Sequence, residues 1–355
     1  MIAGRAAAAL LSAFLAQGAG AEPVPEAVAQ YGEEAAPRRL VIRSTADIAA
    51  FEPVLLAFLE RWPAFRIAYE QWASNDLYLR GEAECRGVAE PADLLLSTAL
   101  DQQVKLVNDG CARPHRSDRT ERLPPSANWR DELFGVTSEP AVMVHNRELV
   151  PPAEAPQSRF DLIDLLRPAD SRYAGRVATY DIEASGLGYL FAFMDSQQAT
   201  TFGSLIEAFG RSGAVATCCS AEIIDGVASG RFLVAYNVLG SYALARAAED
   251  PRIAVTLPED YTLVLSRAAM IPKGARDPDG AGALLDFLLS GEGRQALAAA
   301  HLIVEVGEAG ADPLLPGGDD DMLRPIPLTP ALLVGLDQQK RARFLELWRS
   351  TFPRR

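Results

Sequence analysis

The chain has 355 residues, of which 49% are hydrophobic and 23% are charged, and its formal net charge is −13. A chain of this length and composition can bury a large core, and we expect two globular lobes rather than one. The negative charge argues against nucleic acid or an anionic membrane as a partner. Such surfaces are bound through clustered Lys and Arg, and the sequence forms no such cluster.

Residues 1–21 have the organisation of a secretory signal peptide. An early Arg5 precedes an apolar run, and AGA at 19–21 is a small-residue cleavage site. No later segment approaches about 20 uninterrupted apolar residues, the length of a transmembrane helix. We therefore expect cleavage after Ala21 and a soluble mature protein in the periplasm.

Export changes how the four cysteines are interpreted, because disulfides persist outside the cytoplasm. Cys85 and Cys111 flank a predicted strand, each near the end of a helix, and we expect a disulfide between them. Cys218 and Cys219 are adjacent and leave two alternatives, a vicinal disulfide or two small buried thiols. No Cys spacing is that of a redox pair or a zinc site, and the three His are scattered, so we expect no metal and no cofactor.

The first half of the mature chain alternates between strands and helices. Residues 22–38 carry Pro, Ala, Gly and Glu without periodicity and predict a flexible leader. Apolar periodicity then predicts strands over 40–43, 65–71 and 92–96 and helices over 48–62 and 74–85. This order is typical of a parallel sheet covered on both faces, which we assign to a first lobe over 39–138.

The second half repeats the pattern. Strands are predicted over 141–145, 176–180, 232–236 and 253–255, and they form a second lobe over 139–260. Strands over 261–265 and 268–271, with a helix over 281–300, are expected to complete the first lobe over about 261–305. Residues 306–355 form a C-terminal extension with a terminal helix. The predicted fold class is α/β, with two Rossmann-like lobes joined by a hinge and separated by a cleft.

The stretch VATYDIEASGLGYLF (177–191) predicts a strand that turns into a helix through glycines. A dinucleotide site would need a third glycine, but Phe191 stands at that position. Two interpretations remain: a plain tight turn, or a helix N-terminus that binds a small anion through backbone N–H groups and the hydroxyl of Ser185.

DPDGAGALLDFLLSGEGRQALAAA (277–300), after the strand pair TLVLSRAAMIPKGA (262–275), resembles the periplasmic solute-binding proteins of ABC importers. The similarity covers roughly residues 39–305. Within this group, the sequence most resembles the type II branch that includes binders of ferric iron, phosphorylated sugars and phosphoglycerate. It implies a monomer that binds one small ligand between two lobes, performs no chemistry and delivers the ligand to an inner-membrane permease. QQKRARFLELWRSTF (338–352) is similar to a subgroup linked to two-component systems, so a sensor kinase remains an alternative partner.

The ferric-iron members imply metal ligands after the first and third strands and a tyrosine pair after the last strand of the second lobe. The matching positions here are Ala46, Thr98, Ser241 and Tyr242. Ferric iron prefers anionic oxygen ligands, which Ala46, Thr98 and Ser241 do not supply. A ferric-iron-binding protein therefore remains only an alternative.

The same loops offer neutral hydrogen-bond donors near helix N-termini, the usual means of holding a carboxylate or phosphate. The resemblance places the turn at Ser185 and Gly186 in the cleft and predicts a small organic anion as ligand. The expected ligand-binding residues are Ser44, Thr45, Asn75, Ser97, Thr98, Ser185, Gly186, Asn237 and Tyr242.

The sequence leaves the location of several other side chains open. Thr137, Ser138 and Glu139 are expected near the crossing between the lobes. An arginine would suit a dianionic ligand, because bidentate pairing holds anions strongly. For each candidate taken alone, a solvated or ion-paired surface group is the favoured interpretation; the candidates are Arg130, Arg176 and Arg267. Aromatic residues are expected in the core or on a cleft wall, namely Trp72, Tyr180 and Tyr236.

An enzyme was weighed against this binding function. In this interpretation, Asp181 and Glu183 would be a carboxylate pair and Ser185 the nucleophile. However, no Gly-x-Ser-x-Gly elbow surrounds Ser185, and no His lies in a comparable strand-end loop. We therefore expect no catalytic residues.

Overall fold

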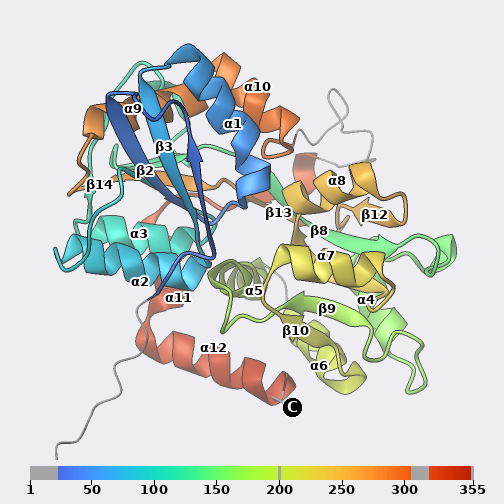
Figure 1. Ribbon diagram of the computed structural model, residues 1–355. Coiled ribbons are helices and arrows are strands. Elements are labelled where there is room, and N and C mark those ends of the chain that lie inside the picture. The colour runs from blue at the N-terminus through green and yellow to red at the C-terminus, as the bar shows by residue number, and fades with distance from the viewer. Residues whose placement is uncertain (1–22, 199–200, 305–319, 353–355) are drawn as a thin grey trace, which may run out of the picture.

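The structure is a computed structural model that describes residues 23–198, 201–304 and 320–352. It has two α/β lobes, each built around one sheet with helices on its faces (Figure 1). The predicted signal peptide, residues 1–21, lies outside the described residues, as does 305–319 at the start of the extension. Within the described part, no helix is long and apolar enough to cross a membrane.

The sheet of the first lobe has the strand order β1-β3-β2-β4-β14-β7-β6, with β5 paired to β14. Its central strands β2, β3 and β4 are parallel, whereas β14 enters antiparallel between β4 and β7. The bounds of its strands are β1 (Ala27–Tyr31), β2 (Arg38–Ser44), β3 (Phe65–Gln71), β4 (Leu94–Ser97), β5 (Ala112–Arg113), β6 (Asn128–Trp129), β7 (Leu133–Gly135) and β14 (Ala268–Pro272).

Helices cover both faces of this sheet (Figure 1). On one face, α1 packs against α10 and α9 through aromatic residues such as Phe58 and Phe287, whose rings meet edge to face. On the other face, α2 and α3 bury apolar side chains such as Leu77 and Val104. The bounds of the helices are α1 (Ile48–Arg61), α2 (Ser74–Cys85), α3 (Leu100–Asn108), α9 (Pro278–Leu288) and α10 (Gly291–Ala299).

The sheet of the second lobe has the order β10-β9-β11-β8-β13-β15, with β12 also paired to β8. The long strand β8 is antiparallel to β11, β12 and β13, and all its residues are buried. The bounds of its strands are β8 (Glu139–Asn146), β9 (Val177–Tyr180), β10 (Val215–Thr217), β11 (Val234–Leu239), β12 (Ile253–Thr256), β13 (Thr262–Leu265) and β15 (Leu323–Pro325).

Helices α7 and α8 cover one face of the second sheet, and α4 and α6 cover the other (Figure 1). The helix α5 lies close to α3 of the first lobe. Their bounds are α4 (Arg159–Leu166), α5 (Gly186–Gln198), α6 (Phe202–Ser212), α7 (Ser220–Ala228) and α8 (Gly240–Glu249). Short 3-10 helices span Thr120–Arg122, Pro152–Glu154, Asp320–Met322 and Pro330–Leu332.

The expectation of a flexible leader over 22–38 is wrong for part of that segment. Ala27–Tyr31 forms β1, an edge strand that pairs antiparallel with β3 from Ala27 opposite Gln71 to Tyr31 opposite Ile67. The Tyr31 hydroxyl donates to Glu52 Oε2 of α1 at 3.0 Å. An edge strand made mostly of small residues carries little apolar periodicity, so its pairing was not visible in the sequence pattern.

The strand predicted over 261–265 was assigned to the wrong lobe. β13 joins the second sheet, with Leu265 opposite Glu139 of β8, and only β14 belongs to the first sheet. The chain therefore returns to the first lobe between β13 and β14. Apolar periodicity identifies a strand but does not specify which sheet it joins.

The C-terminal extension contacts both lobes. After β15, the backbone N–H of Leu328 donates to the carbonyl of Ser126 in the first lobe. Helices α11 (Leu333–Leu336) and α12 (Gln338–Thr351) follow, and α12 buries Leu345 and Trp348 against the second lobe. The predicted terminal helix is present, and the extension links the lobes on one side of the molecule.

Candidate functional site

A cavity of about 200 Å³ lies between the two lobes, where loops at the ends of strands face each other. The first lobe contributes residues after β2, β3 and β4, and its polar and aromatic lining includes Thr45, Asp47, Gln71, Trp72, Ser74 and Thr98. The second lobe contributes Tyr180, Ser185, Cys218, Cys219, Ser220 and Tyr242. We call this cavity the cleft.

Four of the expected ligand-binding residues line the cleft: Thr45, Thr98, Ser185 and Tyr242. The loops that carry the two threonines are held together, because the backbone N–H of Thr98 donates to Thr45 Oγ1 at 3.0 Å. The Ser185 hydroxyl accepts from the N–H of Gly188 at 3.0 Å. It therefore caps the first turn of α5 and lies at the edge of the cleft.

Ser44 and Ser97 do not line the cleft, contrary to expectation. Both are buried, and their hydroxyls accept from the backbone N–H two residues later, Ala46 for Ser44 at 2.9 Å and Ala99 for Ser97 at 3.1 Å. A hydroxyl at a strand end can close its own turn in this way. The side chain that reaches the cleft is the next one along, Thr45 or Thr98.

Asn75 and Gly186 lie beside the cleft, where the lobes touch. The Asn75 amide donates to the carbonyls of Glu183 and Ala184 at 3.1 and 3.0 Å. The N–H of Gly186 donates to Ser74 Oγ at 2.8 Å. These contacts hold the first turn of α2 against the turn that precedes α5, so both residues join the lobes.

Asn237 also does not line the cleft. β11 does not end at 236 as predicted but continues to Leu239 through a register shift against β8, and Asn237 adopts a positive φ of 61° within that shift. Its buried side chain donates to Asp195 Oδ2 at 2.8 Å. The irregularity turns Asn237 into the interior of the second lobe, and Leu239 takes its place at the cleft.

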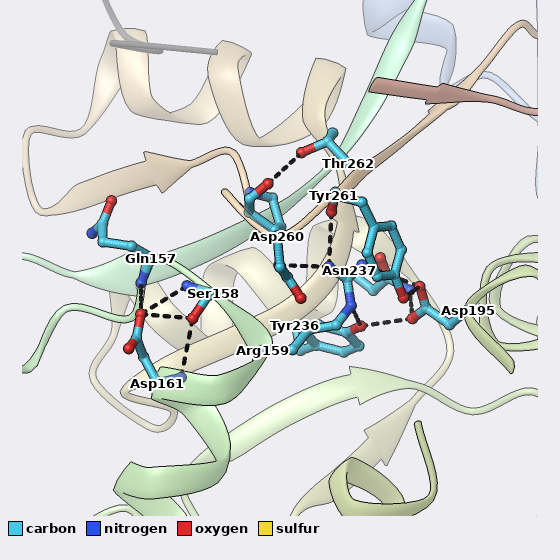
Figure 2. A network of polar contacts seen from close by, with 11 residues as sticks. Gln157, Ser158, Arg159, Asp161, Asp195, Tyr236, Asn237, Asp260, Tyr261 and Thr262 are labelled. Carbon is cyan, nitrogen blue, oxygen red and sulfur yellow. Dashed lines mark hydrogen bonds and ion pairs between the residues drawn. The ribbon is translucent and has the colours of Figure 1, made fainter. Parts of the chain in front are cut away.

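Asp195 belongs to the buried polar network shown in Figure 2. Arg159 donates through Nη2 to Asp195 Oδ1 at 3.1 Å, through Nη1 to Asp260 Oδ1 at 3.0 Å and through Nε to the Tyr236 hydroxyl at 2.6 Å. The hydroxyls of Tyr236 and Tyr261 donate in turn to Asp195. Every member lies in the second lobe, so the network supports that lobe alone.

A second buried network lies where the chain crosses between the lobes. Arg267 donates through Nε and Nη2 to Glu139 Oε1 and Oε2 at 3.1 and 3.0 Å. Thr137 donates to Glu139 and accepts from the N–H of Arg267, each at 2.7 Å, and Ser241 also donates to Glu139. Thr137 and Glu139 stand on one crossing and Arg267 on the other, so this network joins the two crossings.

None of the three candidate arginines reaches the cleft to bind an anionic ligand. Arg267 is buried in its pair with Glu139, Arg130 pairs with Glu132, and Arg176 donates to the carbonyl of Gly230. Within the described residues, no Lys or Arg side chain lines the cleft. Donors to an anion in the cleft are therefore neutral side chains and backbone groups.

Those backbone groups are helix N-termini. The first residues of α2, α5 and α7, or the residues just before them, line the cleft, and so does Asp47, the residue that precedes α1. The first-turn N–H groups of a helix lack intrahelical acceptors and carry the positive end of its dipole. The first-turn N–H groups of Ile48, Gly186 and Gly188 already donate to side chains of the protein, so the cleft combines the remaining N–H groups with hydroxyls and aromatic walls.

Sequence reasoning missed Asp47 and Ser220 as cleft residues. The N–H of Asp47 donates to the Tyr242 hydroxyl of the other lobe at 3.0 Å, and burial raises the pKa of the Asp47 carboxyl. Ser220 and Tyr180 share a hydrogen bond of 2.6 Å between their hydroxyls, and burial raises the pKa of Tyr180 to about 12. Their places at strand ends and helix starts were a usable signal, as for Thr45.

Both pairs of cysteines are joined. The predicted Cys85–Cys111 disulfide is confirmed and links the end of α2 to the segment after α3. Cys218 and Cys219 form a vicinal disulfide, the first of the two alternatives. Among described His, Cys, Asp and Glu side chains, the group close enough to share a metal ion is Cys218, Cys219 and Glu222, whose sulfurs are already bonded to each other.

The sequence model for bacterial extracellular solute-binding proteins matches residues 89–319. The chain belongs to this family. A substrate-binding protein of an ABC transporter from Agrobacterium tumefaciens is similar to the binding protein described here: it is 34% identical with a TM-score of 0.86, over 93% of this chain and 99% of that one. A comparison with curated protein sequences gives no match.

More distant structures share the fold of this solute-binding protein. Iron-bound HitA from Pseudomonas aeruginosa is 18% identical with a TM-score of 0.68, and AfuA from Actinobacillus pleuropneumoniae, with fructose-6-phosphate bound, is 20% identical with a TM-score of 0.69. Each match covers 89% of this chain and 99% of the other. The resemblance to periplasmic solute-binding proteins of ABC transporters, and the bilobed type II fold, are confirmed.

Proposed function

We propose that this solute-binding protein captures a small organic anion, a carboxylate or a phosphorylated compound, between its lobes and delivers it to the permease of an ABC importer. The observation that carries the proposal is the convergence of hydroxyls and helix N-termini from both lobes on one cavity. Donors of this kind stabilise an anion without a balancing side-chain cation.

The electrostatics of the cleft favour a ligand of modest charge. No described cation faces it, while Asp47 and the exposed Glu26 do. Because burial raises the pKa of Asp47, its repulsion of an anion is weakest at acidic pH. The carboxyl of Asp47 and the amide of Gln71 can also accept hydrogen bonds from ligand hydroxyls. A hydroxylated anion would match both walls.

Contacts between the lobes connect ligand capture to delivery. The bonds from Asn75 to 183–184, from Gly186 to Ser74 and from Asp47 to Tyr242 all cross from one lobe to the other. Hinge closure around a ligand creates such contacts and presents a new surface to a partner. A permease is the partner that fits the family, and a neighbouring sensor-kinase gene in place of permease genes would favour the sensing alternative.

Thermal-shift measurements on the mature protein test the ligand class. The panel comprises fructose 6-phosphate, 3-phosphoglycerate, citrate, glucose, lysine and ferric iron. A ligand that binds the folded state raises Tm with its concentration, and we expect shifts from the organic anions. Stabilisation by glucose or lysine alone would contradict the anion assignment, and a stoichiometric iron complex with a visible tyrosinate band would favour the iron alternative.

Titration calorimetry with the most stabilising compound then tests the site. Ser185→Ala and Thr98→Ala each remove one hydroxyl from the cleft, and each should weaken binding by about tenfold, since a hydrogen bond to a charged group contributes roughly 1.5–3 kcal/mol. Ser350→Ala is the matched control, because Ser350 is exposed on α12 and bonds only the carbonyl of Leu347. Unchanged affinity in both cleft variants would show that the loops of Ser185 and Thr98 do not bind the ligand.

A further inference from the structure

The Cys218–Cys219 disulfide occupies a part of the cleft wall that hydrogen bonding to an anion does not use. Both residues line the cleft and are exposed, although cysteine is among the residue types most often buried. They lie between β10 and α7, directly before Ser220. Packing of the lobe interior therefore does not explain them.

Folding stability does not explain this disulfide either. A disulfide stabilises a fold mainly by closing a loop of the unfolded chain, and the gain grows with loop length. Cys85 and Cys111 are 26 residues apart, whereas Cys218 and Cys219 are neighbours with no residue between them. The first pair ties two helical segments together. The second pair can only constrain the backbone where it stands.

That constraint acts on groups in the cleft. The disulfide closes a small ring through the peptide bond between Cys218 and Cys219, so it restricts the backbone immediately before α7. Cys219 is the residue that precedes α7, and Ser220 begins the helix. The Ser220 hydroxyl bonds Tyr180, whose hydroxyl also accepts from the N–H of Leu239. The ring therefore sets the position of the first N–H groups of α7 and of the hydroxyl beside them.

The sulfur atoms themselves supply an uncharged, polarizable surface. Beside them the lining includes Tyr180, Leu187 and Leu239, so this side of the second lobe offers an apolar strip next to the donors of α5 and α7. Small-molecule sites combine such apolar walls with a few placed polar groups. A ligand with an anionic end and a C–H face would use both.

We propose that the Cys218–Cys219 disulfide is a ligand-contacting wall of the cleft that determines solute specificity, and that full affinity requires its oxidised form. This inference rests on the proposed function only in that a solute binds in this cleft, and it does not depend on the charge of that solute. It assigns the vicinal pair to binding and Cys85–Cys111 to folding.

The first experiment is calorimetry on the Cys218→Ser/Cys219→Ser double variant, with the panel compound that most raises Tm of the wild type. We expect a loss of affinity of about tenfold or more, and little change in Tm of the ligand-free protein. The matched control is Cys85→Ser/Cys111→Ser, for which we expect the reverse: a lower Tm and unchanged affinity.

The second experiment reduces and re-oxidises the Cys218–Cys219 disulfide without changing the amino-acid sequence. In Cys85→Ser/Cys111→Ser protein, Cys218–Cys219 is the remaining disulfide of the four cysteines. Dithiothreitol transfers its two thiol hydrogens to the two sulfurs and closes to its own cyclic disulfide. Affinity should fall on reduction and return after re-oxidation with diamide, which takes up the two hydrogens.

The outcomes separate this inference from the proposed function. Anion binding that is insensitive both to the Cys218→Ser/Cys219→Ser change and to reduction overturns the inference and leaves the proposed function standing. Binding of glucose alone that is lost on reduction overturns the anion assignment and supports the disulfide wall. A fall in ligand-free Tm as large as that of Cys85→Ser/Cys111→Ser, with affinity unchanged, would assign the vicinal pair to folding instead.

Discussion

Arg159 and Arg267 are both buried, with 1% and 0% of their side chains exposed, and both pair with carboxylates. They differ in where their partners come from. Arg159 joins Asp195, Asp260 and Tyr236 within the second lobe, whereas Arg267 and Glu139 join the two chain crossings between the lobes. The same chemistry thus fixes the interior of a lobe in one place and the pivot between lobes in the other.

This difference predicts which substitutions affect stability alone and which also affect ligand binding. A buried ion pair contributes little net stability compared with apolar packing, but loss of one partner is costly because the other charge stays buried. Substitutions that break the ion pairs of Arg159 should therefore lower stability and leave the cleft unchanged. Substitutions that break the ion pair of Arg267 should lower stability and also change how the lobes close.

The largest expected effect is that of Asp195→Ala. It removes the buried carboxylate that pairs with the guanidinium of Arg159, which keeps only the partly exposed Asp260 as a charged partner, and it removes the acceptor of Tyr236, Tyr261 and Asn237. We expect the free energy of unfolding to fall by about 3–5 kcal/mol in guanidinium denaturation, with ligand affinity unchanged. Asp164→Ala, at an exposed ion pair on α4, is the control and should change stability by less than about 0.5 kcal/mol.

Glu139→Gln should have the next largest effect. Glutamine keeps the shape of the side chain but removes the charge that balances Arg267, so we expect a loss of about 2–3 kcal/mol. Because Glu139 joins the crossings, small-angle scattering should also show an altered change in radius of gyration on ligand addition. If stability falls but closure and affinity are those of the wild type, Glu139 does not act as a pivot. Glu207→Gln, exposed on α6, is the control.

Two single hydroxyl deletions sharpen the comparison. Ser241→Ala removes one donor to Glu139, whereas Tyr236→Phe removes a donor to Asp195 and also the acceptor of Arg159 Nε. We expect a cost of about 1–2 kcal/mol for Ser241→Ala, as for one hydrogen bond to a charged group, and a larger cost for Tyr236→Phe. Only Ser241→Ala should change ligand affinity. Equal affinities of the two variants would mean that the hinge network does not communicate with the cleft.

Asp101 is a buried carboxyl without a guanidinium donor, and its substitution should have the smallest net effect. Its Oδ1 lacks a hydrogen-bond partner among the described atoms. Burial raises its pKa to about 7, against the opposing effects of backbone N–H groups and, more weakly, of the charge of Arg341. The unfolded chain releases this proton near pH 4. Stability from this group is therefore full below about pH 4 and is lost as pH rises to about 7.

Asp101→Asn should remove that pH dependence. We expect the variant to be about 1 kcal/mol more stable than the wild type at pH 8, because the new amide must find its own partners and this offsets most of the gain. The difference should vanish or reverse at pH 4. Equal unfolding free energies of the two proteins at pH 8 would show that Asp101 is not held in a raised-pKa state.

Local patterns in the sequence predicted much of the fold. Apolar periodicity located most strands and helices, and the residues that follow parallel strands pointed to Thr45, Thr98 and Ser185 in the cleft. The errors arose where a residue's place depends on distant pairing. The register shift in β11 turned Asn237 inward, and β13 paired with β8 instead of joining the first sheet. The burial of Arg267 likewise depends on Glu139, 128 residues away.

The position of β14 has a consequence for the order in which the molecule forms. β14 lies between β4 and β7, so the first lobe cannot complete its sheet until residues 268–272 have been synthesised, long after the second lobe has begun. The ion pair of Arg38 with Asp277 spans 239 residues. Such distant contacts slow folding, because loop closure must precede the pairing that rewards it. The first lobe therefore depends on one of the last strands to be synthesised, and its folding is coupled to the completion of most of the chain.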